Sequence, residues 1–156
     1  MSARLKALCA LLAGLAAAGS LAGCASSVST SSFKGEQHNV AQTVADLQSD
    51  VTASDEKKIC AKDLAASLVA RLNTVQETHN GRSVRRAVAG RCRTVVKDQL
   101  SEIDSTDMKV ESVALAAGAA PRSATARVRS VYSGKRRFQT LALRKEGGRW
   151  KIAGVG

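Results

Sequence analysis

The stretch RFQTLALRKEGGRWKIAGV, residues 137–155, decides the fold of this chain. Apolar and polar residues alternate on both sides of Gly147 and Gly148, and this period of two predicts a pair of strands. Two glycines between alternating segments are typical of the tight turn of an antiparallel hairpin. On the second strand Trp150 and Ile152 lie on the same face, so we expect both side chains to point into the core.

Two further alternating segments precede this hairpin, at residues 108–118 and 123–132. Short connections separate the segments, which predicts an antiparallel meander of about four strands. If Ala126 faces the core, then Arg127 and Arg129 point outward, because neighbouring side chains of a strand lie on opposite faces.

Three apolar stripes with helical spacing occupy the first half of the chain. The first runs from Val40 to Val51. The second begins after Ser54, a residue type that favours helix starts, and is expected to end at residues 79–81. The third is expected to begin at Ser83. Helices followed by strands predict an α+β fold, in which N-terminal helices pack on a curved, cone-like antiparallel sheet of about four strands.

Residues 39–155 resemble the nuclear transport factor two-like superfamily, also called the cystatin-like cone. The helical first half, the hairpin at residues 137–155 and the ending GGRWKI, residues 147–152, carry the resemblance. It implies a single domain over residues 39–156. Relatives of this fold include isomerases, dehydratases and cyclases, so the resemblance also implies acid–base chemistry by carboxylate, His or Tyr inside the cone. This chain departs from the pattern in its long helical half and its small number of strands.

The first residues of the chain carry an export signal. Residues 1–23 combine two basic residues, a short apolar run and small residues, which indicates a signal peptide and not a membrane span. The tetrapeptide Leu21-Ala22-Gly23-Cys24 resembles the lipobox of bacterial lipoproteins. The resemblance implies cleavage before Cys24 and a thioether-linked diacylglycerol, with palmitate-type chains, on its sulfur. A plain secreted protein with a chance cysteine is the alternative.

The segment after this cysteine, residues 24–38, is rich in Ser and Thr and predicts a flexible tether. Together the signal and the lipid place the protein on the outer face of the bacterial cytoplasmic membrane or in the cell envelope. Cys60 and Cys92 remain in the folded part. In an exported domain an even pair predicts a disulfide, and both residues lie on apolar stripes of expected helices. A pair of free, buried thiols is the alternative.

The chain is strongly basic, with 24 Lys and Arg against 13 Asp and Glu, and its charge is uneven. Residues 78–156 contain 17 basic and 6 acidic residues. Such asymmetry suggests an anionic neighbour, and a solvated surface is the alternative. Export argues against nucleic acid, so the expected partners are anionic lipid, wall polymer or an envelope protein. The candidate anion-binding residues are Arg82, Arg85, Arg86, Arg127, Arg129, Lys135, Arg136, Arg137 and Lys151.

The sequence predicts no catalytic residues, no metal ligands and no cofactor. Glu111 is the one acid with an expected inward position on a strand, and the two histidines do not form a catalytic or metal-binding set with the other residues. Like charges at Arg127 and Arg129 would repel a second copy, which favours a monomer. The function expected is a non-enzymatic binding or accessory domain. A small-molecule carrier or a cone-pocket enzyme of the isomerase or dehydratase type is the alternative.

Overall fold

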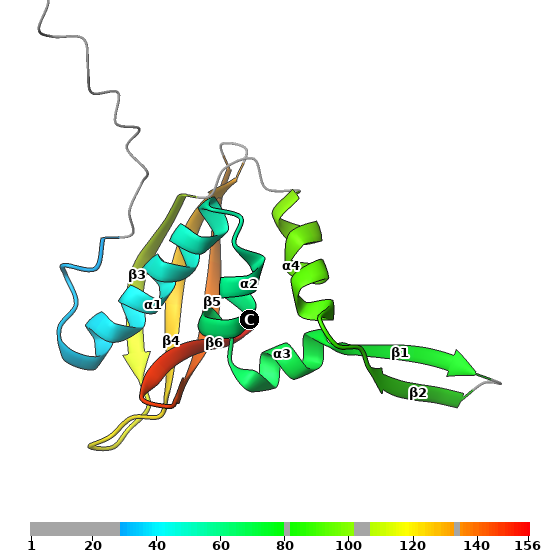
Figure 1. The fold of residues 1–156 in the computed structure, drawn as a ribbon. Helices are drawn as coiled ribbons and strands as arrows, with labels where there is room; N and C mark the ends of the chain where they lie inside the picture. Colours follow the sequence, from blue (N-terminus) through cyan, green and yellow to red (C-terminus); the bar gives the residue numbers. More distant parts are fainter. Residues whose placement is uncertain (1–28, 80–81, 102–106, 133–134) are drawn as a thin grey trace, which may run out of the picture.

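Four consecutive strands form one antiparallel sheet in the order β3-β4-β5-β6 (Figure 1). They are β3 (Asp107–Leu115), β4 (Ser123–Tyr132), β5 (Lys135–Glu146) and β6 (Arg149–Val155). This computed structural model describes residues 29–79, 82–101, 107–132 and 135–156. The expected α+β fold, with N-terminal helices on a four-stranded antiparallel sheet, is confirmed.

The turn between β5 and β6 has the geometry expected from its two glycines. Gly147 and Gly148 have φ values of +56° and +79°. A two-residue hairpin turn of the type that matches strand twist needs positive φ at both central residues, which glycine adopts without a steric penalty. The pairing of Glu146 with Arg149 sets the register as far as Leu143 and Ile152, and a bulge shifts it by one residue from Ala142 onward.

Helix α1 (Gly35–Thr52) crosses the inner face of the sheet and closes the core (Figure 1). It begins at Gly35, four residues before the expected start of the domain. Val40 and Val44 are fully buried, and Trp150 and Ile152 point inward as predicted, with exposed fractions of 5% and 2%. The other inward strand residues are Val110, Val113, Ala124, Ala126, Val128, Leu141 and Leu143. Each larger side chain stabilises the fold by about 1.5–3 kcal/mol through burial.

A polar contact connects the first turn of α1 to strands β5 and β6. The indole Nε1 of Trp150 donates to Glu36 Oε2 at 2.7 Å, and Lys145 Nζ donates to Glu36 Oε1 at 2.7 Å. These hydrogen bonds lower the pKa of Glu36 below its usual range. Because Glu36 lies in the first turn of α1, its carboxylate also complements the positive end of the helix.

The predicted second helix is wrong over much of its length. It is divided into α2 (Glu56–Lys58), the π-helical turn η1 (Ile59–Asp63) and α3 (Ala66–Leu72). Between η1 and α3 the backbone is extended, because Ala65 N donates to Ile152 O at 2.8 Å and Leu64 bridges to the edge strand β6. The sheet edge therefore interrupts a segment whose apolar spacing is helical.

The predicted start of the third helix at Ser83 is also wrong. Strands β1 (Thr74–His79) and β2 (Arg82–Ala87) form a separate antiparallel hairpin, and helix α4 (Arg91–Ser101) follows. Gly90, with φ of +77°, lies directly before α4. Cross-strand pairing, which no helical stripe reveals, sets the conformation of this segment.

Cys60 of η1 and Cys92 of α4 form the predicted disulfide, with a Cα–Cα distance of 6.2 Å. Cys92 is buried and Cys60 is half-buried. The bond joins α4 to the body of the molecule, as expected from the two apolar stripes. Cys24 and residues 1–23 lie outside the described residues. Among the helices that are described, none is both long and apolar enough to cross a bilayer.

Candidate functional site

Basic side chains gather on the sheet face that points away from α1. The register places Arg129 between Lys109 of β3 and Phe138 of β5, and places Arg144 opposite Lys151. Side chains that are directly opposite or two residues apart share a face. We call this surface the basic face. Its members are Lys109, Arg127, Arg129, Arg136, Arg144 and Lys151.

Two members of the basic face have side-chain partners that hold them in place. The guanidinium of Arg127 lies 5.0 Å from the ring centroid of Phe138, whose side chain is 55% exposed. Arg129 Nε donates to Glu111 Oε1 at 3.0 Å. The expectation that Glu111 points inward is therefore wrong, because its carboxylate lies with Arg129 on the outer face. The outward positions predicted for Arg127 and Arg129 are confirmed.

The remaining candidates on the sheet are spread over more than one surface. Lys135 and Arg137 alternate with Arg136 along β5, so they lie on the opposite side of the strand although all three are exposed. Lys151 is half-buried and donates to Ala61 O of η1 at 3.2 Å. Of the six residues of the basic face, Lys109 and Arg144 were not among the sequence candidates.

The three candidates Arg82, Arg85 and Arg86 lie on β2, in the hairpin that projects from the body of the molecule (Figure 1). Arg85 and Arg86 are exposed, as is the apolar side chain of Val84. These residues were expected on a helix, and the structure separates them from the basic face. The base of the hairpin is held by Arg91, whose Nη1 donates to Thr74 O at 2.6 Å.

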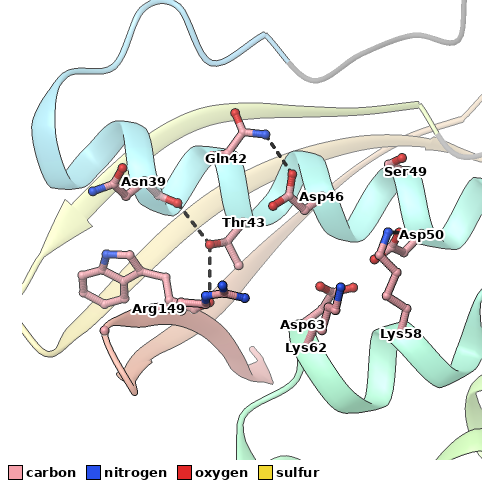
Figure 2. Close-up of a pocket in the computed structure, with 12 residues that line it drawn as sticks. Asn39, Gln42, Thr43, Asp46, Ser49, Asp50, Lys58, Lys62, Asp63 and Arg149 are labelled. Atoms are coloured by element: carbon pink, nitrogen blue, oxygen red, sulfur yellow. Dashed lines mark hydrogen bonds and ion pairs between the residues drawn. The ribbon is translucent and has the colours of Figure 1, made fainter.

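A polar cleft of about 580 Å³ lies on the opposite side of the molecule from the basic face, between α1, the α2–η1 segment and the β5–β6 turn (Figure 2). Helix α1 contributes Asn39, Gln42, Thr43, Asp46, Ser49 and Asp50. The facing side consists of Lys58, Lys62, Asp63, Gly148, Arg149 and Trp150. This lining contains three carboxyl groups and three basic groups from segments far apart in the sequence.

Two of these carboxyl groups are buried at the floor of the cleft. Asp50 is 4% exposed and Asp63 is 6% exposed. Lys58 Nζ donates to Asp50 Oδ1 at 2.6 Å, and this hydrogen bond raises the pKa of Lys58. Asp63 Oδ2 is buried and has no hydrogen-bond partner among the described residues. Figure 2 shows the carboxyl group of Asp63 directed from η1 toward α1.

The environment of Asp63 stabilises its protonated form. Burial raises the pKa of Asp63 to about 7, and the negative charge of Asp50, a hydrogen bond with Asp50 and the charge of Asp46 act in the same direction. The ammonium group of Lys58 acts in the opposite direction. Asp63 therefore exchanges its proton near neutral pH, where a base could remove the proton or a bound cation could displace it.

No sequence pattern described above predicts this cleft. Lys58, Lys62 and Asp63 fall within the predicted second helix, which the structure divides at η1. The π-helical turn η1 and the extended residues after it direct Asp63 toward α1, and no short motif encodes that geometry. The position of Asp63 four residues after the buried Ile59 fits an amphipathic helix, so the local sequence does not reveal that Asp63 is directed toward α1.

Comparisons with known proteins identify relatives by structure only: no family model and no curated protein matches the chain. The chain is similar to an NTF2-like protein of unknown function from Silicibacter pomeroyi, with 13% identity, a TM-score of 0.47 and coverage of 75% of this chain and 89% of that chain. It is also similar to a candidate dehydratase of the NTF2-like family from Streptomyces avermitilis, with 13% identity, a TM-score of 0.48 and coverage of 77% and 92%.

A de novo designed protein with a curved β-sheet is similar as well, with 14% identity, a TM-score of 0.41 and coverage of 73% of this chain and 95% of that chain. Similarity at this level of identity and TM-score assigns no activity to this chain.

Proposed function

We propose that this chain is a lipid-anchored, extracytoplasmic protein whose folded domain binds anionic components of the bacterial envelope without catalysis. The observation that carries the proposal is the basic face, where six Lys and Arg side chains from all four strands of the main sheet share one surface. Only Arg129 of this set forms an ion pair with an acid among the described residues.

The charges of the basic face suit a surface of negative charge. Each Lys or Arg close to an anionic membrane contributes roughly 1 kcal/mol, and the attraction falls off within about 10 Å at moderate salt. Arg127, stacked on the exposed ring of Phe138, also offers an apolar contact beside its charge. The projecting hairpin adds the exposed charges of Arg85 and Arg86, one on each of its faces.

The proposed anchor would hold this domain near the membrane. Eleven residues lie between Cys24 and the first residue of α1, counting Cys24 itself. A chain of that length reaches at most about 35–40 Å, so a lipid on Cys24 would keep the basic face within contact distance of headgroups. Mass spectrometry of the native protein tests the anchor: we expect a mature chain that begins at Cys24 and carries acyl chains.

Vesicle binding tests the role of the basic face separately from the anchor. The Cys24→Ser chain, which cannot be lipidated, is mixed with vesicles of phosphatidylglycerol or phosphatidylcholine, and the bound fraction is measured by sedimentation. We expect binding to the anionic vesicles only, weakened by added salt. A parallel measurement with anionic wall polymer separates a lipid surface from a polymer as the partner.

Matched variants locate the binding surface. The triple variant R127Q/R136Q/R144Q removes three exposed charges of the basic face, and K57Q/R93Q/K97Q removes three exposed charges elsewhere. We expect the first variant to lose roughly 1 kcal/mol of binding free energy per residue and the second to lose less. Equal losses in the two variants, or binding that is insensitive to salt, would contradict a specific role for the basic face.

We do not assign the isomerase or dehydratase activity of the alternative hypothesis. The inward side chains of β3 to β6 that are described as buried are apolar and pack in one core with α1. A cone-pocket enzyme needs a proton-transfer group near that interior, and the acid expected there, Glu111, lies on the outer face with Arg129.

A further inference from the structure

We propose that the polar cleft binds a small zwitterion, with its ammonium group against Asp50 and Asp63 and its anionic group toward Lys62 and Arg149. The basic face and the lipid anchor play no part in this inference. It follows from the distribution of charge between the floor and the rim of the cleft.

The floor of the cleft holds two carboxyl groups and one ammonium group. Lys58 pairs with Asp50 at 2.6 Å, while the Oδ2 atom of Asp63, buried among the same side chains, has no hydrogen-bond partner among the described residues. A buried acceptor without a donor is costly. A ligand ammonium group supplies the missing hydrogen bond and the missing positive charge together.

The charged groups around Asp63 come from each segment that lines the cleft. Asp46 and Asp50 belong to α1, Lys58 to α2, Lys62 to η1 and Arg149 to β6. Gln42 Nε2 already donates to Asp46 Oδ1 at 2.8 Å, so Asp46 is partly satisfied by its own helix. Asp63 is the carboxyl group whose surroundings leave it short of a cation.

The rim of the cleft has the opposite character. Lys62 and Arg149 are exposed, and neither forms an ion pair with an acid in the part of the chain that is described. An ammonium and a guanidinium that line the same cleft suit a carboxylate or a phosphate. No three described His, Cys, Asp or Glu side chains are arranged to hold a metal ion, so an organic cation suits the floor better than a metal.

Binding of an ammonium group should release a proton. Asp63 has a pKa raised to about 7 by burial and by neighbouring carboxylates, and a cation beside it favours the ionised form. We therefore expect affinity to increase as the pH rises to about 7 and to level off above that value, where Asp63 is already ionised.

Calorimetry on the purified full chain tests the proposal with defined probes. The zwitterions are γ-aminobutyrate and glycerophosphoethanolamine, and the matched single charges are butylamine and butyrate. We expect the zwitterions to bind more tightly than either single charge. A preference for γ-aminobutyrate indicates a free amino acid, whereas a preference for glycerophosphoethanolamine together with binding to phosphatidylethanolamine vesicles indicates a lipid headgroup.

Two variants with matched controls assign the ends of the ligand. We expect D63N to weaken zwitterion binding at least about tenfold and to abolish proton release, measured as the dependence of the binding heat on the buffer. K62Q should weaken binding of the zwitterions and leave binding of butylamine unchanged. The controls are D98N and K57Q, which change exposed residues that do not line the cleft.

Three results would each overturn the proposal. The first is the absence of heat with every probe, including the zwitterions at millimolar concentration. The second is unchanged affinity in D63N, whose fold is checked by circular dichroism. The third is proton uptake on binding, since it would mean that the ligand favours the protonated form of Asp63.

Discussion

At the scale of single residues, Asp63 shows how burial changes the chemistry of a common side chain. An exposed aspartate at this position of a helix would be ionised at neutral pH and would contribute little to stability. In this structure the carboxyl group is 6% exposed and lies among the carboxyl groups of Asp46 and Asp50. Below about pH 7 its proton is therefore part of the native state.

The first prediction concerns the pH dependence of the free energy of unfolding. The folded pKa of Asp63 is about 7 and its unfolded value is 3.8, so the folded state binds more protons between these values and the stability that Asp63 contributes is lost as the pH rises through this range. D63N stays neutral over this range. We therefore expect its free energy of unfolding, relative to that of the wild type, to rise by roughly 2–4 kcal/mol as the pH increases from about 4 to above about 7.

Urea unfolding of both chains across this pH range is the measurement, with D98N as the control. If the wild type and D63N had stability curves of the same shape, Asp63 would not be the group that holds the proton. No ligand is needed for this comparison, so it tests the protonation of Asp63 independently of the proposed binding of a zwitterion.

At the scale of elements, the disulfide decides where α4 lies. Cys92 is the one residue of α4 described as buried, and the bond to Cys60 connects the helix to η1. The amide N of Cys92 also donates to Asn73 Oδ1 at 2.7 Å, which ties the start of α4 to the end of α3. With so little apolar burial, α4 depends on these connections more than on its own packing.

The second prediction is that removal of the disulfide destabilises the protein by about 3–4 kcal/mol, because a loop of 32 residues is no longer closed in the unfolded state. In the variant C60A/C92A we expect the amides of α4 to exchange with solvent much faster, while those of β4 and β5 stay protected. Reduction of the wild type serves as the control and should reproduce the pattern. Equal acceleration in the sheet would mean that α4 is not a separate unit.

The β1–β2 hairpin is the other element with a weak connection to the body. A two-stranded hairpin is marginally stable in water on its own, and its base is fixed by Arg91, which donates to Thr74 O at 2.6 Å and to Leu72 O at 3.4 Å. The hydrogen bond from Val88 N to Asn73 O adds to this junction.

The third prediction is that R91A increases amide exchange in β1 and β2 by about tenfold and lowers global stability by roughly 1–2 kcal/mol, since two backbone carbonyl groups lose a charged donor. The control is R93A, which removes an exposed arginine from the same helix turn. Were the hairpin amides to exchange at the same rate in both variants, the contact of Arg91 would not be what holds the hairpin.

At the scale of the whole molecule, charge is balanced on one side and unbalanced on the other. The cleft formed by α1, α2 and η1 carries three acidic and three basic groups, while the basic face lies across the sheet. The basic residues of the sheet repel one another and have few acids nearby, since residues 78–156 contain 17 basic against 6 acidic residues. This repulsion opposes the compact state.

The fourth prediction is that moderate salt raises the thermal midpoint of unfolding, because screening weakens repulsion on the exposed basic face more than it weakens the ion pair of Lys58 with the buried Asp50. In the variant R127Q/R136Q/R144Q we expect a higher midpoint at low salt and a smaller response to added salt. Differential scanning fluorimetry with sodium chloride and with potassium chloride provides the measurement. A fall of the midpoint in both salts would show that attractive ion pairs dominate.

The sequence by itself determined the sheet. Alternation around Gly147 and Gly148 leaves one inward face next to the turn, so the inward Trp150 and Ile152 follow from local pattern. Alternation along β4 gives the outward Arg127 and Arg129 in the same way. The helix of Val40 and Val44 and the pairing of the two cysteines also follow, because periodicity and burial agree for these residues.

Only the tertiary structure decided the segment from η1 to β2 and the polar cleft that depends on it. Leu64 and Ala65 have helical spacing, but the free edge of β6 offers them backbone hydrogen bonds that a continuous helix would forgo. That competition involves residues about 90 positions apart, and it turns Asp63 toward Asp50. A local pattern reports which face of an element is apolar, whereas the partner of a buried carboxyl group is set by elements that meet only in the folded molecule.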